Sequence, residues 1–452
     1  MDRIYVYCTA ALILLTIGSQ VFRKSFDPFA PIWLFLVGYI QVYVIQAISY
    51  RDYSIKIRGI DLVTAGNLRA LWALAWFLCV YYSPLGRILA RKAPSAPENW
   101  SKPLVFGVCP ILIAWGLFCS GAALSGGAEE QTMISQEENL LRQFPMVLLL
   151  AGNMLIVTGR RSNPSSRFLV TSGIAIAALY SLLWMMNGKR SHSLFAVLSG
   201  VCSYYVSKGK KPPFTVLLAT SVAGAVVVTV AIGWRGNNQY ERNLSGFVEY
   251  LSEFDPSKVL ENINVKEKDG IDEADPVKTS KETEEYCGFL LMLDTVPMKS
   301  SFDYGSSYIR IFSTYIPRIV WPDKPYFGRE EWVNAWIAGS EFHRDETFTG
   351  PAIGVLGATQ LNGGAIGTVV VLAGIAILIR SAYEYYRLHA RTPWAQVFWS
   401  MTYYNAWLMV VNDDPFVWFY YVYGFALLPP LSFFWIVNKF FYRDPVESQE
   451  SC

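Results

Sequence analysis

Residues 314–328, with the sequence TYIPRIVWPDKPYFG, combine cationic and aromatic side chains on an irregular backbone. Three prolines fix φ and remove backbone donors, which excludes a regular helix or a central strand. Arg318 and Lys324 offer fixed cationic groups. Trp321 and Tyr326 offer flat apolar faces, and the combination suits anionic or sugar-bearing ligands. The same residue types also collect in amphipathic segments on a membrane surface, and composition favours neither interpretation.

Further cations lie where apolar segments meet the same polar side of the chain. Arg190 lies with Lys189 in a very short turn between two apolar segments, and Arg235 ends another such segment. Arg310 precedes the proline-rich stretch. Each of them alone is typical of a residue that anchors a helix end at the membrane edge. Because a guanidinium gives bidentate hydrogen bonds to a phosphate, the group as a whole favours binding of a diphosphate without a metal.

A proton acceptor could come from His343 or from Asp413. His343 lies in the long polar interval beside Asp345 and Glu346, and Asp413 lies with Asp414 in a tight turn between the last two apolar segments. An imidazole or a carboxylate is a suitable base for a sugar hydroxyl. Two adjacent acids before a proline are also typical of a solvated helix start, so both interpretations of Asp413 stay open.

Several common chemistries lack their motifs in this chain. There is no HExxH, no P-loop and no G-x-S-x-G, so peptidase, ATPase and α/β-hydrolase functions lose their usual support. The seven cysteines include no CxxC pair, and we expect no disulfide framework, no metal site and no cofactor. A net charge of +2 implies no extended basic surface for nucleic acid.

The composition is that of a polytopic all-α membrane protein. Of 452 residues, 53% are hydrophobic and only 16% are charged, with a mean hydropathy of +0.27. A helix needs about 20 mostly apolar residues to cross a bilayer, and this length predicts about eleven spans. They are expected near residues 4–22, 31–49, 65–82, 104–124, 144–159, 168–186, 194–207, 214–234, 365–379, 397–411 and 416–437. The first span lacks a cleavage site, so we expect it to stay as an anchor.

These spans divide the chain into four linear blocks. Residues 1–234 hold about eight helices, 235–362 form a long polar interval, 363–437 hold about three helices, and 438–452 form a tail. The sequence contains no repeat of fixed period.

The polar interval is expected to contain both solvated and helical segments. Residues 266–285 have the composition of a mobile, solvated excursion. Apolar spacing predicts amphipathic helices over 247–260 and 289–313. Glycines within 350–357 and 363–367 predict close helix packing or a re-entrant turn.

The distribution of Lys and Arg predicts orientation, because positive short loops stay in the cytoplasm. Four positive segments alternate onto one side, at residues 86–102, 160–167, 207–211 and 380–391. The long polar interval and the N-terminus then face the outside, and the tail faces the cytoplasm. The positive loop 51–69 falls on the outer side in this scheme, which conflicts with the rule.

Three stretches resemble the bacterial O-antigen polymerase family, the Wzy-type oligosaccharide repeat-unit polymerases. They are Gly188-Lys189-Arg190, IPRIVWPDKP at 316–325, and TGP at 349–351 followed by LNGGAIG at 361–367. Their order and the polytopic layout between residues 140 and 440 are similar to that family. One feature departs from it. Relatives often carry an acidic residue near the glycine-rich entry to the later span, where this chain has ATQ at 358–360.

The resemblance implies a metal-independent glycosyl transfer on the outer face of the bacterial inner membrane. A growing glycan on undecaprenyl diphosphate would pass to the non-reducing end of a fresh lipid-linked repeat unit. The implied roles are charge stabilisation by Arg190, Arg235 and Arg318, ligand binding by Lys189, Arg310, Trp321, Lys324 and Tyr326, and proton transfer by His343 or Asp413. The implied partners are the lipid-linked oligosaccharide, membrane lipid, a chain-length regulator and a flippase.

Other functions share parts of this pattern. A ligase that transfers finished glycan to an acceptor would use the same donor chemistry. A lipid-linked oligosaccharide flippase or transporter would line a cavity with charged residues inside its spans, whereas we expect the charges here to avoid the spans and gather at one edge. A scaffold in an export complex would leave the proline-rich stretch unexplained.

Overall fold

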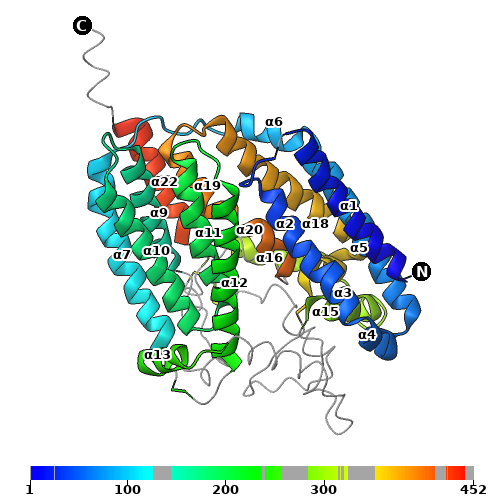
Figure 1. The fold of residues 1–452 in the computed structure, drawn as a ribbon. Coiled ribbons are helices and arrows are strands. Elements are labelled where there is room, and N and C mark those ends of the chain that lie inside the picture. Colours follow the sequence, from blue (N-terminus) through cyan, green and yellow to red (C-terminus); the bar gives the residue numbers. More distant parts are fainter. Residues whose placement is uncertain are drawn as a thin grey trace. The chain divides into compact units, whose positions relative to one another are not determined.

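The computed structural model is all-helical over the residues that it describes (Figure 1). These are residues 2–24, 26–125, 144–236, 240–241, 243–255, 284–313, 316, 320–323, 352–412, 424 and 426–442, with the backbone alone for 122–125, 235, 236, 307, 310 and 311. No strand occurs among them. The predicted all-α class is therefore confirmed for this part of the chain.

Seven helices in the described part are long and apolar enough to cross a membrane. They are α1 (Asp2–Phe22), α2 with its continuation to residue 49, α5 (Ile60–Tyr82), α7 (Lys102–Ser125), α10 (Arg167–Met186), α12 (Phe214–Gly236) and α18 (Gly354–Leu388). Each coincides with an expected span. The sequence therefore located these seven helices correctly.

The other four expected spans have a different form. Residues 144–159 and 194–207 lie in two shorter helices, α9 (Met146–Arg161, 16 residues) and α11 (Arg190–Val206, 17 residues). Residues 397–411 are divided by a turn at 403–404 into α19 (Pro393–Thr402) and α20 (Asn405–Val411). The last span includes residues outside the described part, and its described end forms α22 (Leu428–Ile436) and η5 (Val437–Phe441). The number eleven therefore stays a prediction.

The chain divides into two compact units that do not follow the four linear blocks. The first unit combines Met1–Ala93, Ile271–Tyr385 and Asn405–Tyr420. The second combines Pro94–Gly270, Tyr386–Tyr404 and Tyr421–Cys452. Residues of the polar interval thus belong to the same compact units as the apolar helices around them.

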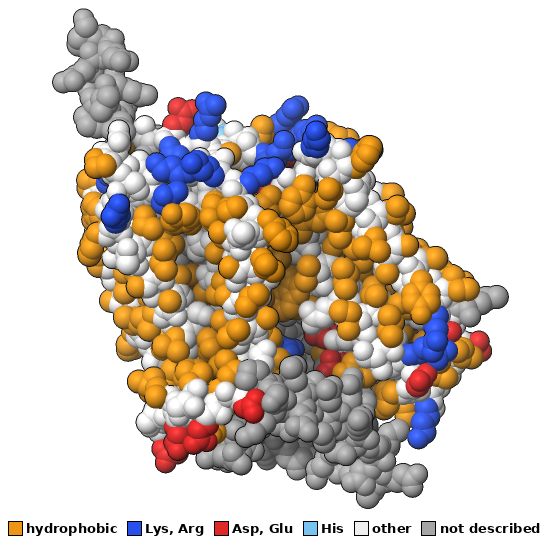
Figure 2. Space-filling view, viewed as in Figure 1, with side chains coloured by type: hydrophobic (Ala, Val, Ile, Leu, Met, Phe, Trp, Pro, Cys, Tyr) orange, Lys and Arg blue, Asp and Glu red, His pale blue; other side chains and the backbone are white. Residues whose placement is uncertain are grey.

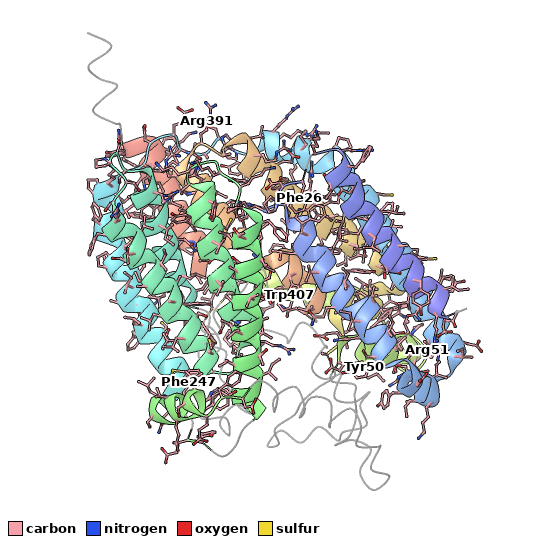
Figure 3. The ribbon with its side chains drawn as sticks, viewed as in Figure 1. Phe26, Tyr50, Arg51, Phe247, Arg391 and Trp407 are labelled. Carbon is pink, nitrogen blue, oxygen red and sulfur yellow. The ribbon has the colours of Figure 1, made fainter. Side chains whose placement is uncertain are left out.

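The first unit is held by aromatic packing between α2 (Pro31–Ile40) and α5. The rings of Phe35 and Phe77 are parallel with centroids 3.6 Å apart, and the Tyr39 hydroxyl donates to the Ala70 carbonyl over 2.6 Å. Trp407 of α20, labelled in Figure 3, lies against α2. The remaining elements of this unit are η1 (Gln41–Gln46), α3 (Ala47–Ser49), α4 (Arg51–Arg58), α6 (Leu85–Lys92), α15 (Glu285–Thr295) and α16 (Ser306–Ser313).

The second unit is built around α9, whose residues from Met146 to Gly159 are all buried. Helices α7, α10, α11 and α19 pack against it. Its contact with α10 is close because two glycines face each other, and a Cβ on Gly173 would lie 2.5 Å from the Gly152 carbonyl oxygen. Small residues of this kind allow apolar helices to approach in a membrane.

Charges lie at the ends of each unit, with apolar surface between them (Figure 2). In the second unit, Arg161, Arg167 and Lys208 are exposed at one end. Glu249 of α13 (Leu244–Ser252) and Glu253, which directly follows α13, are exposed at the other. Figure 3 shows Phe247 of α13 at this second end, where it packs on Trp234. An apolar belt between charged ends is typical of a protein that spans a bilayer.

One expectation for the polar interval is wrong. Helix α15 is not amphipathic, because all its residues from Tyr286 to Met292 are buried, so it is a core helix of the first unit. The expectation of a mobile, solvated excursion over 266–285 lies outside the described residues except at its end. There the Gln46 amide donates to Glu284 over 3.0 Å and to Glu285 over 2.6 Å. Local composition does not indicate this contact, because Gln46 lies far away in the sequence.

Candidate functional site

The structure describes only part of the predicted site. Side chains are described for Lys189, Arg190 and Trp321. For Arg235 and Arg310 the backbone alone is described, within α12 and α16. The remaining candidates lie outside the described residues, namely Arg318, Lys324, Tyr326, His343 and Asp413.

Lys189 and Arg190 follow a rigid turn between α10 and α11. Gly188 has φ +66°, its N–H donates to the Met185 carbonyl over 2.8 Å, and the Lys189 N–H donates to the Trp184 carbonyl over 2.9 Å. This hydrogen-bond pair is the Schellman motif, which places glycine at the left-handed position. The Asn-Gly sequence at 187–188 therefore ends α10 and sets where the two cations begin α11.

Side-chain hydrogen bonds lock the two helices of this hairpin together. The Ser181 hydroxyl donates to the Ser193 carbonyl over 3.2 Å, and the Ser193 hydroxyl donates to the Ser181 carbonyl over 3.0 Å. The buried Tyr404 hydroxyl donates to the Ser191 carbonyl over 3.0 Å. The start of α11 is thus fixed from two sides.

The charge of Arg190 is not balanced by a carboxylate among the described residues. Arg190 and Lys189 are both exposed, and no carboxylate of the described residues lies within ion-pair distance of Arg190. A cation at a helix N-terminus is also disfavoured by the helix dipole. An anion bound at this turn would relieve both the charge repulsion and the unfavourable dipole interaction.

The positive loop that conflicted with the orientation rule is largely paired. Arg51, labelled in Figure 3, donates to Asp2 and also forms an ion pair of 2.8 Å with Asp52. Arg58 lies 3.3 Å from Asp294. Arg51 and Arg58 therefore belong to local ion pairs of the first unit, which gives them a structural role there.

Unlike Arg51 and Arg58, Arg69 forms no ion pair with a described carboxylate, and the sequence analysis did not select it as a site residue. It lies inside the membrane helix α5, so the expectation that charges avoid the spans is wrong at this position. Its Nη1 donates to Gln360 Oε1 over 3.2 Å and to Thr368 Oγ1 over 3.1 Å. A charged residue inside an apolar span was the available signal, because such residues are rare and tend to be functional.

The partners of Arg69 lie on either side of a break in α18. Gly363 and Gly364 leave the helical conformation. Thr359 and Thr368 hydroxyls are nonetheless 2.9 Å apart, although nine residues of continuous helix would separate them by roughly 13 Å. The helix therefore folds back on itself. A Cβ on Gly367 would lie 2.4 Å from the Thr359 carbonyl oxygen, so the glycines provide both the turn and the close packing that their spacing predicted.

The turn of α18 is held by the segment that precedes α16. The Asp303 N–H donates to the Leu361 carbonyl over 2.8 Å, and the Gly305 N–H donates to Asn362 Oδ1 over 3.1 Å. The Gln360 amide donates to the Val296 carbonyl over 2.6 Å. The side chain that receives the Arg69 hydrogen bond is thereby fixed in orientation.

Two further observations concern the acidic residues of the described part. No group of three or more His, Cys, Asp or Glu in the described residues could hold a metal ion. Two adjacent carboxylates of the described residues, Glu284 and Glu285, share the Gln46 amide. The two adjacent glutamates are visible in the sequence. They stand at the end of the stretch 266–285, whose composition predicts a solvated excursion, so the sequence analysis did not select them.

Comparison of the chain with protein families, curated proteins and solved structures finds no match.

Proposed function

We propose that this chain is a membrane glycosyltransferase that polymerises undecaprenyl-diphosphate-linked oligosaccharide repeat units into a surface polysaccharide. It acts at the outer face of the bacterial inner membrane with about eleven spans. A hydroxyl at the non-reducing end of the fresh unit attacks C1 of the growing glycan. The bond from C1 to the diphosphate breaks, the hydroxyl proton passes to a base, and undecaprenyl diphosphate leaves.

The observation that supports this proposal most is the turn that carries Lys189 and Arg190. Two exposed cations stand on a fixed helix start, and Arg190 has no carboxylate partner among the described residues. A leaving diphosphate gains negative charge as its bond to the sugar breaks, and preorganised donors stabilise that charge without reorganisation. A guanidinium suits this task because its planar fork matches two phosphate oxygens.

The other roles follow from residue type and belong to the same proposal. Arg235 and Arg318 add positive charge for the diphosphate, with Arg310 and Lys324 binding its oxygens. Trp321 and Tyr326 stack on sugar rings. His343 or Asp413 accepts the proton of the acceptor hydroxyl. No metal or cofactor takes part.

A glycan-length assay tests the proposal in cells. A strain that lacks the protein is complemented with wild type, Arg190→Ala or Arg190→Lys, and lipid-linked glycan is separated by length on a gel. We expect single repeat units without the protein, a ladder with wild type, and at least a tenfold loss of polymer with Arg190→Ala, since losing one oxyanion donor costs about 100-fold or more. Lysine should restore part of the ladder because it keeps the charge.

A matched control is available in the same unit. Arg391, labelled in Figure 3, is exposed in the loop before α19, and Arg391→Ala should leave the ladder intact. A full-length ladder with Arg190→Ala would contradict the assigned role. Long chains that stay on the carrier lipid in the deletion strain would indicate a ligase instead, and absence of units from the outer face would indicate a transporter.

A further inference from the structure

Arg69 lies within α5 close to the level at which the apolar helix α1 begins. Two residues earlier on α5, the Asn67 amide donates to the Asp2 carbonyl over 3.3 Å, so Asn67 is level with the first residue of the apolar helix α1. With a rise of about 1.5 Å per residue, Arg69 is only roughly 3 Å further along α5. In a bilayer crossed by α1 and α5, the guanidinium would therefore lie near the end of the apolar layer.

The hydrogen bonds of Arg69 leave one edge of its guanidinium available. Both of its hydrogen bonds, to Gln360 and Thr368, start from Nη1. Within the described residues, Nε and Nη2 donate to nothing, and the guanidinium carbon Cζ lies 5.4 Å from the centroid of the Trp72 ring. Nε and Nη2 form the edge that donates bidentately to carboxylates and phosphates.

The residues that accept hydrogen bonds from Arg69 carry no negative charge. Gln360 and Thr368 are neutral acceptors, and no described carboxylate forms an ion pair with Arg69. An unpaired cation that is partly removed from water costs several kcal/mol unless an anion accompanies it. The geometry thus points to an anion that is supplied from outside the described residues.

Apolar side chains continue from Arg69 into the membrane layer. Trp76, two turns further along α5, donates its indole N–H to the Val369 carbonyl of α18 over 2.9 Å. Ile366 and Val370 of α18 are 77% and 64% exposed. A ligand that contacts Arg69 with its anionic group can therefore lay an apolar chain along the same two helices, which a free phosphate cannot do.

We propose that Arg69 and the α18 turn bind the phosphate group of a membrane lipid. Nε and Nη2 of Arg69 donate to two phosphate oxygens, and the lipid chain lies against Trp76 and Ile366. This chemistry is common to anionic phospholipids and to polyprenyl phosphates. The inference does not rest on the proposed glycosyl transfer, because it follows from the contacts of Arg69 alone.

Lipid binding by the purified full chain tests the inference. Native mass spectrometry and thermophoresis would measure binding of phosphatidylglycerol, undecaprenyl phosphate and, as a phosphate-free probe, diacylglycerol. We expect wild type to bind at least one phosphate lipid and not diacylglycerol, and Arg69→Gln to weaken that binding about tenfold or more, as for loss of hydrogen bonds to a charged group. Arg69→Lys keeps the charge without the fork and should lie between them.

The controls separate binding from folding. Arg87→Gln removes an exposed arginine of the same unit and should bind as wild type does. Melting temperatures identify any variant that fails to fold, and Arg69→Lys then carries the test. Preference for phosphatidylglycerol indicates a structural or regulatory headgroup, and preference for undecaprenyl phosphate indicates a carrier lipid. Equal binding of phosphate lipids by wild type and both Arg69 variants, or no binding by wild type, would overturn the inference.

Discussion

Single charged residues of this chain differ in how their charge is compensated. Arg380 and Glu384 form a hydrogen-bonded ion pair within α18, with 15% and 6% of their side chains exposed. Arg87 approaches the same carboxylate at 3.9 Å but is 53% exposed. Arg69, by contrast, has neutral partners only in the described part. The Arg380–Glu384 ion pair is structural, whereas Arg69 is available to a ligand.

Removing the shared carboxylate should destabilise the first unit. Glu384→Gln leaves Arg380 buried without its counter-charge, and breaking such a pair costs roughly 3 kcal/mol or more. Arg87→Gln removes only an exposed partner and should cost less than about 1 kcal/mol. Denaturant titration of the purified variants in detergent measures both. Equal midpoints for the two variants would show that the Glu384 pair is not a structural one.

At the scale of single residues, the sequence predicted positions that depend only on neighbouring residues in the chain. Gly188, Lys189 and Arg190 stand together in the chain, and the turn places both cations at an exposed helix start as the short connection predicted. The sequence analysis failed at Arg69, because a single arginine in a short, interrupted apolar segment resembles a loop residue. Its partners Gln360 and Thr368 are about three hundred residues away, and only folding brings them together.

At the scale of elements, the break in α18 is the feature that organises the first unit. The two parts of the helix fold back because Gly363 and Gly364 depart from helical geometry, and Gly367 lets the second part lie against Thr359. This brings Gln360 and Thr368 to the same guanidinium. The LNGGAIG stretch thus acts through backbone geometry and not through its side chains.

Gly364 and a glycine inside a regular helix of the same unit offer a matched pair of substitutions. Gly364 has φ +62°, which L-residues rarely adopt, and Gly364→Ala should cost about 1–3 kcal/mol. Gly18 lies inside α1 with no atom within 4 Å of a Cβ position, so Gly18→Ala should not destabilise the protein. Thermal unfolding of the purified proteins measures the difference. A destabilised Gly18→Ala with an unaffected Gly364→Ala would contradict the described turn.

Elements were predictable to the extent that they are long and apolar. All seven long apolar helices of the described part coincide with expected spans, because about 20 apolar residues are distinctive. The expected span 397–411 is instead interrupted at residues 403–404, and the expected amphipathic α15 is buried on all sides. Both depend on packing partners that a local window of sequence does not contain.

For the whole molecule, the charge pattern supports a membrane protein with two chemically different ends. The second unit carries exposed arginines and lysines at one end and the acidic residues Glu249 and Glu253 at the other (Figure 2). With the positive end in the cytoplasm, α13 and the Arg190 turn would face the outside, as the proposed reaction requires. The positive loop 51–69 still conflicts with this orientation, because the rule counts Lys and Arg whether or not acids pair with them.

The most direct test of the proposed reaction is reconstitution of the purified full chain in liposomes. Undecaprenyl-diphosphate-linked repeat units are supplied, and glycan length and free undecaprenyl diphosphate are measured together. The proposal predicts a ladder of joined units, with one undecaprenyl diphosphate released for each new linkage and without added metal. Units that keep their original length, whether or not they cross the bilayer, would contradict it.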